Sequence, residues 1–177
     1  MTDIQGGVSM TDQIDTKTEL LEAMDHEWER LYRLIMDTGP DVLVEKRDSA
    51  GWSAKDHLAH LAVWENSVLT MLRDGTPRWE GLGIDRAIYS LEDFDPENEV
   101  IRRNTAGMPL EEVVAFLKNT QDEMRRHVDG MTDEALLRPL SDFAEGGQGE
   151  TVMRRLLGTF PWHQAEHRAY IERILAG

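Results

Sequence analysis

Two histidines near the end of this 177-residue chain have the spacing of metal ligands. His163 and His167 are four residues apart, so on a helix they lie one turn apart and about 40° from each other around the axis. The residues that share this face are aromatic or apolar: Phe160, Tyr170, Ile171 and Ile174. Two imidazole nitrogens one turn apart can bind a single divalent ion at about 2.0–2.1 Å. The pair is therefore a candidate for part of a buried metal site.

A third ligand must come from another helix, and His60 is the candidate. It borders the apolar face of an earlier predicted helix, with Met71 about 20° and Trp64 about 40° from it around the axis. At about 1.5 Å per residue, His60 lies about 10 Å from the start of its helix, and the other two lie about 14–20 Å from the end of theirs. These depths agree if the two ends share one pole of the protein. The sequence favours one ion held by His60, His163 and His167. The alternative is that all three are core histidines with ordinary hydrogen-bond partners.

Two further residues are candidates for a catalytic role, His57 and Tyr170. His57 lies one turn before His60 on nearly the same face of the helix. Three roles stay open for it: a hydrogen-bond partner of a ligand, an acid or base, or a surface residue near the start of the helix. Tyr170 could wall a pocket together with Trp64 and Trp162, although core packing is the simpler explanation for aromatic residues at helical spacing.

Other polar residues near the histidines have simpler explanations. Asp56 could accept a hydrogen bond from an imidazole one turn later, but a helix-capping role already accounts for it. Glu166 is expected to be a surface acid and Glu65 to have a structural role. His26 and His127 fall outside the apolar faces of their helices, so we expect them to be solvated.

Four long segments must position these side chains, and each has the periodicity of an amphipathic helix. The segments are residues 15–37, 53–73, 109–129 and 151–176. Ser53 followed by Asp56 is a capping-box pattern that marks the start of the second segment. Gly158 and Pro161 are expected to kink or restart the fourth.

These segments predict an all-α fold, a four-helix bundle in up-down-down-up order. Residues 74–108 form a crossover with short, weakly helical pieces, and its length allows the second and third helices to run parallel. Residues 141–150 are rich in glycine and predict a mobile loop. Residues 15–177 are expected to form one domain after a flexible extension at residues 1–14.

The crossover carries apolar side chains that need a cover: Trp79, Leu82, Ile84, Ile88, Tyr89 and Leu91. The cover is either the bundle itself or a second copy of the chain, so a homodimer is one expectation.

The composition excludes several classes of protein. Nineteen Lys and Arg against thirty-four Asp and Glu give a formal net charge of −15. Such a surface repels phosphate backbones and anionic lipids, so we expect neither nucleic acid nor a membrane among the partners. The chain has no cysteine, which excludes disulfides, thiolate zinc sites and cysteine nucleophiles. No apolar stretch approaches the roughly 20 residues of a membrane span, and the N-terminus does not resemble a secretory signal, so a cytoplasmic location is expected.

Two motifs carry a resemblance to a known family. GWSAKDHLAHLAVWE (51–65) followed by GTFPWHQAEHRAYI (158–171) resembles the DinB/YfiT-like superfamily of metalloenzymes, and is most similar to its ClbS/DfsB branch. The segment PENEVIRRNTAGMPLEEVVAFL is also similar to that branch. The resemblance implies an up-down-down-up bundle and a three-histidine metal site that maps onto His60, His163 and His167. His57 and Pro161 depart from the pattern of the branch.

The resemblance implies several functions and selects none, because its members include thiol-dependent transferases, a maleylpyruvate isomerase and a protein that disarms a genotoxin. We predict a metal-dependent enzyme that hydrolyses a small electrophilic molecule or transfers a thiol to it. The metal is a divalent ion, with zinc or nickel favoured. Any thiol must be a diffusible, low-molecular-weight cofactor, since the chain has no cysteine. The alternatives are a protein that binds and sequesters a small molecule without turnover, and a structural bundle that mediates protein–protein contacts.

Overall fold

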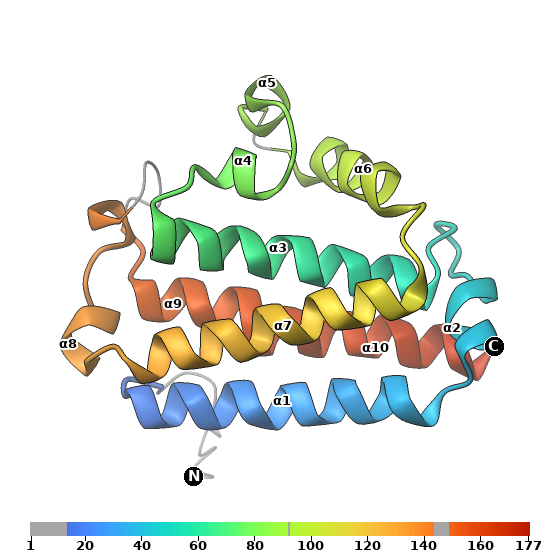
Figure 1. The fold of residues 1–177 in the computed structure, drawn as a ribbon, viewed down its shortest axis with the longest axis horizontal. Coiled ribbons are helices and arrows are strands. Elements are labelled where there is room, and N and C mark those ends of the chain that lie inside the picture. Colours follow the sequence, from blue (N-terminus) through green and yellow to red (C-terminus); the bar gives the residue numbers. More distant parts are fainter. Residues whose placement is uncertain (1–13, 92, 144–148) are drawn as a thin grey trace, which may run out of the picture.

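The computed structural model describes residues 14–91, 93–143 and 149–177, within which four long helical rods lie side by side (Figure 1). The rods are α1 (Lys17–Asp37), α3 (Ala54–Asp74), α7 (Leu110–Asp129) and the composite of α9 (Val152–Leu157) and α10 (His163–Ala176). The predicted extension at 1–14 lies outside the described residues except for residue 14. Residues 144–148, the centre of the predicted loop, also lie outside them.

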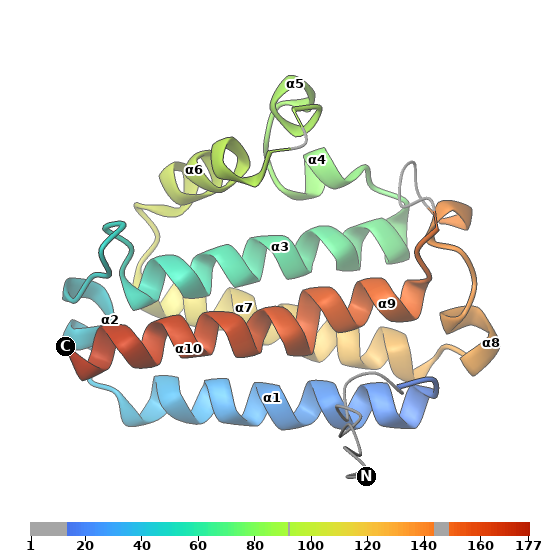
Figure 2. The same ribbon diagram turned by 180° about the vertical axis from the view of Figure 1, so that it is seen from behind.

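The prediction of an all-α fold is confirmed for the described residues, where only two isolated β-bridges accompany the helices. α1 and the α9–α10 rod run in one direction, and α3 and α7 run in the other (Figures 1 and 2). The fold is richer than four helices. The shorter elements are α2 (Pro40–Glu45), α4 (Arg78–Gly81), α5 (Arg86–Tyr89), α6 (Phe94–Thr105), α8 (Asp133–Leu136) and a 3-10 turn at Leu140–Asp142.

Local hydrogen bonds encoded in the sequence fix where the first two rods begin. Thr16 caps α1 together with Glu19, and Ser53 caps α3 together with Asp56, each as a capping box. Asp56 also pairs with Arg47 at 3.2 Å. The carboxylate of Asp56 is therefore occupied by capping, and it sets the start of the helix that carries two of the candidate histidines.

Two buried apolar clusters fill the bundle along its length. The first includes Phe160 and Met124 and the second includes Leu58 and Leu117, all of them fully buried. The removal of this surface from water is the main favourable contribution to folding. Among the described helices, none combines the length and the apolar composition that a bilayer crossing requires.

The crossover between α3 and α7 folds back onto α3 (Figure 1). Leu82, Ile84 and Ile101 of the crossover are buried with Trp64 of α3 in a third apolar cluster. The bundle itself therefore covers most of the apolar side chains of this segment, although Leu91 remains 62% exposed.

α4 approaches α3 at a distance that only a glycine allows. A Cβ atom built at Gly81 would lie 2.9 Å from the Cα of Ser67 and 3.1 Å from its Cβ. Gly81 therefore holds α4 against α3, and this contact fixes the position of Arg78 at the other end of α4.

Gly81→Ala should destabilise the protein by about 1–3 kcal/mol, because the added methyl group overpacks the contact between α4 and α3. Urea denaturation followed by circular dichroism measures the change. Gly107→Ala is the matched control, since a Cβ there meets nothing within 4 Å. It should change stability by less than about 0.5 kcal/mol. Equal stability of the two variants would show that the close approach does not constrain α4.

Candidate metal centre

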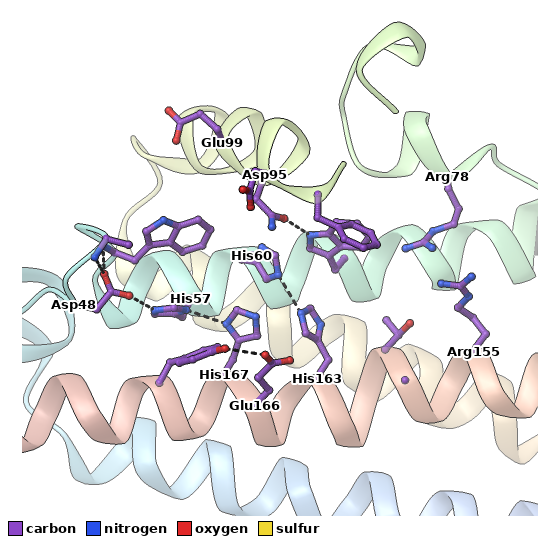
Figure 3. Close-up of a pocket in the computed structure, with 18 of the residues that line it drawn as sticks. Asp48, His57, His60, Arg78, Asp95, Glu99, Arg155, His163, Glu166 and His167 are labelled. Carbon is purple, nitrogen blue, oxygen red and sulfur yellow. Dashed lines mark hydrogen bonds and ion pairs between the residues drawn. The ribbon is translucent and has the colours of Figure 1, made fainter. Parts of the chain in front are cut away.

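The structure brings His60 of α3 together with His163 and His167 of α10 (Figure 3). One ring nitrogen from each residue lies within 4.8 Å of the others. The Nε2 atoms of His60 and His163 are 3.1 Å apart. That is close to the roughly 3.3 Å between two nitrogens of a tetrahedral site with bonds of about 2.0–2.1 Å. His26 is exposed and His127 is half-buried, and neither belongs to this cluster.

A distorted turn immediately before His163 sets the orientation of α10. Residues Gly158–Trp162 form a π turn with Pro161 inside it. Proline has no N–H, and its ring clashes with the carbonyl of residue i−4, so a regular α-helix cannot pass this position undistorted. A π turn holds one extra residue and changes the phase of the helix that follows. The fourth rod therefore continues through Pro161 and presents His163 and His167 to α3.

Burial keeps the three imidazoles neutral. His60 and His167 are 5% and 7% exposed. Burial lowers the pKa of His60 well below its ordinary value, and the neighbouring His163 lowers it further. Burial also lowers the pKa of His163 to about 4, and it lowers the pKa of His167. Each ring therefore has an unprotonated nitrogen at neutral pH, which is the state that metal ligation requires.

Hydrogen bonds among the described residues do not satisfy this cluster. His60 Nδ1 is buried and has no hydrogen-bond partner among the described residues. A neutral imidazole has one donor and one acceptor nitrogen, so the 3.1 Å contact between His60 and His163 uses only one lone pair. A cation in the cluster would use the lone pairs that hydrogen bonding leaves. Three neutral imidazoles fit a borderline divalent ion such as zinc or nickel.

His57 connects His167 to the loop that precedes α3. Its Nδ1 lies 2.9 Å from His167 Nδ1, and its Nε2 lies 3.2 Å from Asp48 Oδ2. Burial lowers the pKa of His57, although the hydrogen bond to Asp48 opposes this. The residue is only 5% exposed. The interpretation of His57 as a surface residue is therefore wrong, because the loop before α3 covers the start of the helix.

Asp48 is a residue of the site that the sequence analysis did not identify. Its Oδ1 accepts hydrogen bonds of 2.9 Å from the backbone N–H groups of Ala50 and Trp52. Burial would raise the pKa of Asp48, but these bonds and the one with His57 lower it overall. The bond from Ala50, two residues on, is the pattern of an Asx turn. An aspartate in a short turn before a predicted helix was the available signal.

The three histidines line a cavity of about 740 Å³. Trp64 and Tyr170 line it as well, in agreement with one of the two roles open for these aromatic residues. Trp162 instead packs against the apolar core and beneath the guanidinium of Arg154. The cavity also has lining residues from distant parts of the chain that helical periodicity could not reveal: Trp52, Arg78, Phe94, Asp95, Glu99 and Arg155.

Tyr170, the other candidate for catalysis, lies beside His57 and Glu166. Its ring stacks on that of His57 with centroids 5.5 Å apart, and its hydroxyl donates to Glu166 Oε1 at 2.8 Å. This hydrogen bond raises the pKa of Tyr170, so its oxygen keeps the proton at neutral pH. Glu166 is exposed, as predicted, and also lines the cavity.

Glu65 lies outside the cavity, in the centre of the bundle. It is fully buried and accepts hydrogen bonds of 2.7 Å from Gln121 of α7 and Gln164 of α10. Burial raises its pKa to about 8, against the effect of both amides. These contacts join three rods, which agrees with the structural role expected from the sequence.

Three solved structures share this fold at low sequence identity. An uncharacterised protein of Escherichia coli UTI89 is 17% identical, with a TM-score of 0.72 over 93% of this chain and 95% of that one. The colibactin self-resistance protein ClbS, solved in complex with a double-stranded DNA, is 14% identical, with a TM-score of 0.72 over 91% and 96% of the two chains. A protein of Streptococcus pneumoniae is 19% identical, with a TM-score of 0.67 over 93% and 92%.

The structure of ClbS contradicts the exclusion of nucleic acid as a partner, because a protein of this fold is seen with a DNA duplex. That exclusion rested on the net charge of −15. Net charge is a sum over the whole surface, whereas contacts with phosphates need only a local group of cations. The prediction that excluded nucleic acid on the basis of net charge is therefore wrong.

A match to a family model extends over most of the sequence. No curated protein matches the chain, but the model of the DinB superfamily matches residues 23–171. That range includes the three clustered histidines, His57 and the π turn. The resemblance inferred from the two motifs is thereby confirmed, and the chain belongs to the DinB superfamily.

Proposed function

We propose that this protein is a metal-dependent enzyme in which His60, His163 and His167 hold one divalent ion. It acts on a small electrophilic molecule, either by hydrolysis or by transfer of a diffusible thiol. The observation that carries this proposal is the convergence of three neutral imidazoles at the wall of one cavity, within 4.8 Å of one another. Three protein ligands leave a coordination position for water or substrate, as catalytic sites require.

The metal would supply Lewis acidity, which lowers the pKa of a bound water or thiol and polarises an electrophile. The chain supplies the orientation of the ligands. If the Nε2–H of His57 donates to Asp48, then His57 Nδ1 accepts from the Nδ1–H of His167. His167 Nε2 is then the unprotonated nitrogen available for ligation. His57 and Asp48 are positioning residues in this scheme.

Tyr170 and Glu166 hold a proton at the edge of the cavity. The hydroxyl of Tyr170 donates to Glu166 in the absence of a substrate. A substrate oxygen placed at the histidines would offer an alternative acceptor for the same proton. Trp64, which is buried and lines the cavity, forms an apolar wall along which the substrate lies.

A second candidate function is the binding of a small molecule without turnover. The similarity of fold to ClbS, a self-resistance protein, favours it. The same cavity would then retain a toxic molecule. Turnover assays of the metal-loaded protein with a panel of electrophiles, with and without low-molecular-weight thiols, distinguish an enzyme from a sequestering protein.

His60→Ala and His163→Ala should each weaken zinc binding by more than the roughly 10–100-fold that loss of a ligand's hydrogen-bond partner costs, because each removes one of the three ligands itself. The wild-type protein should bind one ion per chain. Competition with a chromophoric chelator measures affinity, and elemental analysis measures stoichiometry. His26→Ala and His127→Ala are the controls, and both should bind zinc like the wild type. An absence of bound zinc or nickel after repletion of the wild type would contradict the proposed site.

The metal-free protein should lose stability as the pH falls from about 6.5 toward about 4. In the unfolded chain histidines titrate near pH 6.5, whereas the pKa of folded His163 is lowered to about 4. The unfolded state therefore binds more protons in this window, so each buried neutral ring costs about 1.4 kcal/mol of stability per pH unit. Glu65, with a folded pKa raised to about 8, has the opposite effect but contributes only one proton.

Urea denaturation at several pH values after dialysis against a chelator measures this dependence. His163→Ala removes one ring, so its stability should fall by about 1.4 kcal/mol less per pH unit than that of the wild type. His26→Ala should follow the wild type, because His26 is exposed. The same slope in all three proteins would mean that His163 is solvated.

His57→Leu should lower zinc affinity by about 10–100-fold while the fold is retained, because it breaks the chain of hydrogen bonds that orients His167. Leucine fills a similar volume at this buried position without a hydrogen-bonding group. Chelator competition gives the affinity, and nitrogen NMR shifts of the His167 ring report its tautomer. Asp95→Asn, a change at another carboxylate of the cavity wall, should alter neither. An unchanged tautomer in His57→Leu would remove the positioning role.

A further inference from the structure

Two arginines from different elements lie together at one end of the cavity, beyond His163 (Figure 3). Arg78 comes from α4, which Gly81 holds against α3, and Arg155 comes from α9. Both line the same cavity as the three histidines. They are far apart in the sequence, so only the fold brings them together.

Both guanidinium groups have hydrogen-bond donors that no described residue of the protein uses. The Nε atoms of Arg78 and Arg155 are both closed to solvent and have no hydrogen-bond partner among the described residues. Among the described residues, the one hydrogen bond that the Arg78 side chain donates is a long one of 3.5 Å, from Nη2 to Ser67 Oγ. Arg155 donates through Nη2 to Glu150 at 2.6 Å. A buried donor without an acceptor is unfavourable. Both guanidinium groups are therefore suited to donate hydrogen bonds to acceptor atoms of a ligand.

The charges at this end of the cavity also favour an anion. Burial and the repulsion from neighbouring Arg155 lower the pKa of Arg78 to about 10, so Arg78 remains a cation at neutral pH. Glu150 pairs with Arg155. Glu97 also lies near Arg78, but its Oε2 has no hydrogen-bond partner among the described residues, and burial raises its pKa although Arg78 opposes this. An anion between the two arginines would relieve their repulsion.

The position of Arg78 connects this end of the cavity to the histidines. Its guanidinium lies over the ring of Trp64, 5.1 Å from the centroid. The same indole ring lies 5.8 Å from the ring of His60 and 6.5 Å from that of His163. Trp64 is therefore a shared wall, and a molecule held by Arg78 would extend along it toward the three histidines.

We propose that Arg78 and Arg155 form an anion subsite for a carboxylate or phosphate group of the small molecule whose reactive end reaches the histidines. The forked guanidinium donors match the paired oxygens of these groups. Asp95 and Glu99 line another part of the cavity and repel an anion, so they favour this orientation over the reverse. The substrate class is then a small organic acid or phosphate ester. The assignment of a substrate whose reactive end reaches the histidines rests on the proposed function, but the binding of the anion itself requires no metal.

Isothermal titration calorimetry of the full chain after removal of metal by a chelator tests the subsite. The probes are sodium phosphate and sodium acetate, and the arginine pair should bind at least one of them with a saturable heat of one anion per chain. Comparison of the two titrations identifies the group that the subsite prefers. Arg78→Gln and Arg155→Gln should each weaken that binding about tenfold or more, since each removes a charge-assisted hydrogen-bond donor. Arg78→Lys keeps the cation without the fork, so it should bind with intermediate affinity.

Arg154→Gln is the matched control. Arg154 precedes Arg155 on α9 but is exposed and lies over Trp162 outside the cavity. Its loss should leave anion binding unchanged, and circular dichroism verifies that all variants are folded. No saturable binding of either anion, or equal loss in Arg154→Gln and Arg155→Gln, would overturn the subsite. Anion binding without any metal binding would support the subsite and contradict the proposed enzyme. Metal binding without anion binding would contradict the subsite and leave the proposed enzyme supported.

Discussion

Four imidazole rings meet where α3 packs against α10, and the rest of the site depends on keeping them out of water. The ring centroids of His60 and His167 are 4.5 Å apart, and those of His57 and His167 are 5.1 Å apart. Polar rings at this depth are unfavourable unless their nitrogens are paired. The turn at Asp48 provides a partner for His57. Only an additional group in the cluster would provide one for His60 Nδ1.

Helical periodicity is enough to place the long rods and the faces of their histidines, because both follow from residue spacing within one segment. His60, His163 and His167 all lie at the predicted interface. Contacts between segments cannot be derived from residue spacing, because they depend on how the segments fold against one another. Asp48 reaches His57 from a short turn without periodicity, and Arg78 and Arg155 meet only after the crossover folds back. The π turn at Pro161 was predictable as a disruption of the helix, but a proline alone does not specify which kind of turn forms.

The charge of the chain shows the difference between a total and a local property. The formal net charge is −15, and exposed carboxylates account for much of it. At one end of the cavity, however, two arginines lie close enough for Arg155 to lower the pKa of Arg78. A ligand responds mainly to the charges within one Debye length of its binding site, about 8–10 Å. The total charge therefore constrains long-range attraction and repulsion, while the cavity selects its own ligands.

The two halves of the cavity come from parts of the chain under different constraints. The histidines project from long rods whose packing is shared by proteins only 14–19% identical to this one. The residues at the other end come from α4, a four-residue helix of the crossover, and from the first turns of the last rod. The crossover packs on one outer face of α3, in an apolar cluster separate from the two clusters inside the bundle, so away from close contacts such as that of Gly81 it has more room to vary. Within one fold, the rods can therefore keep a cluster of histidines in place while residues of the crossover alter the other end of the cavity.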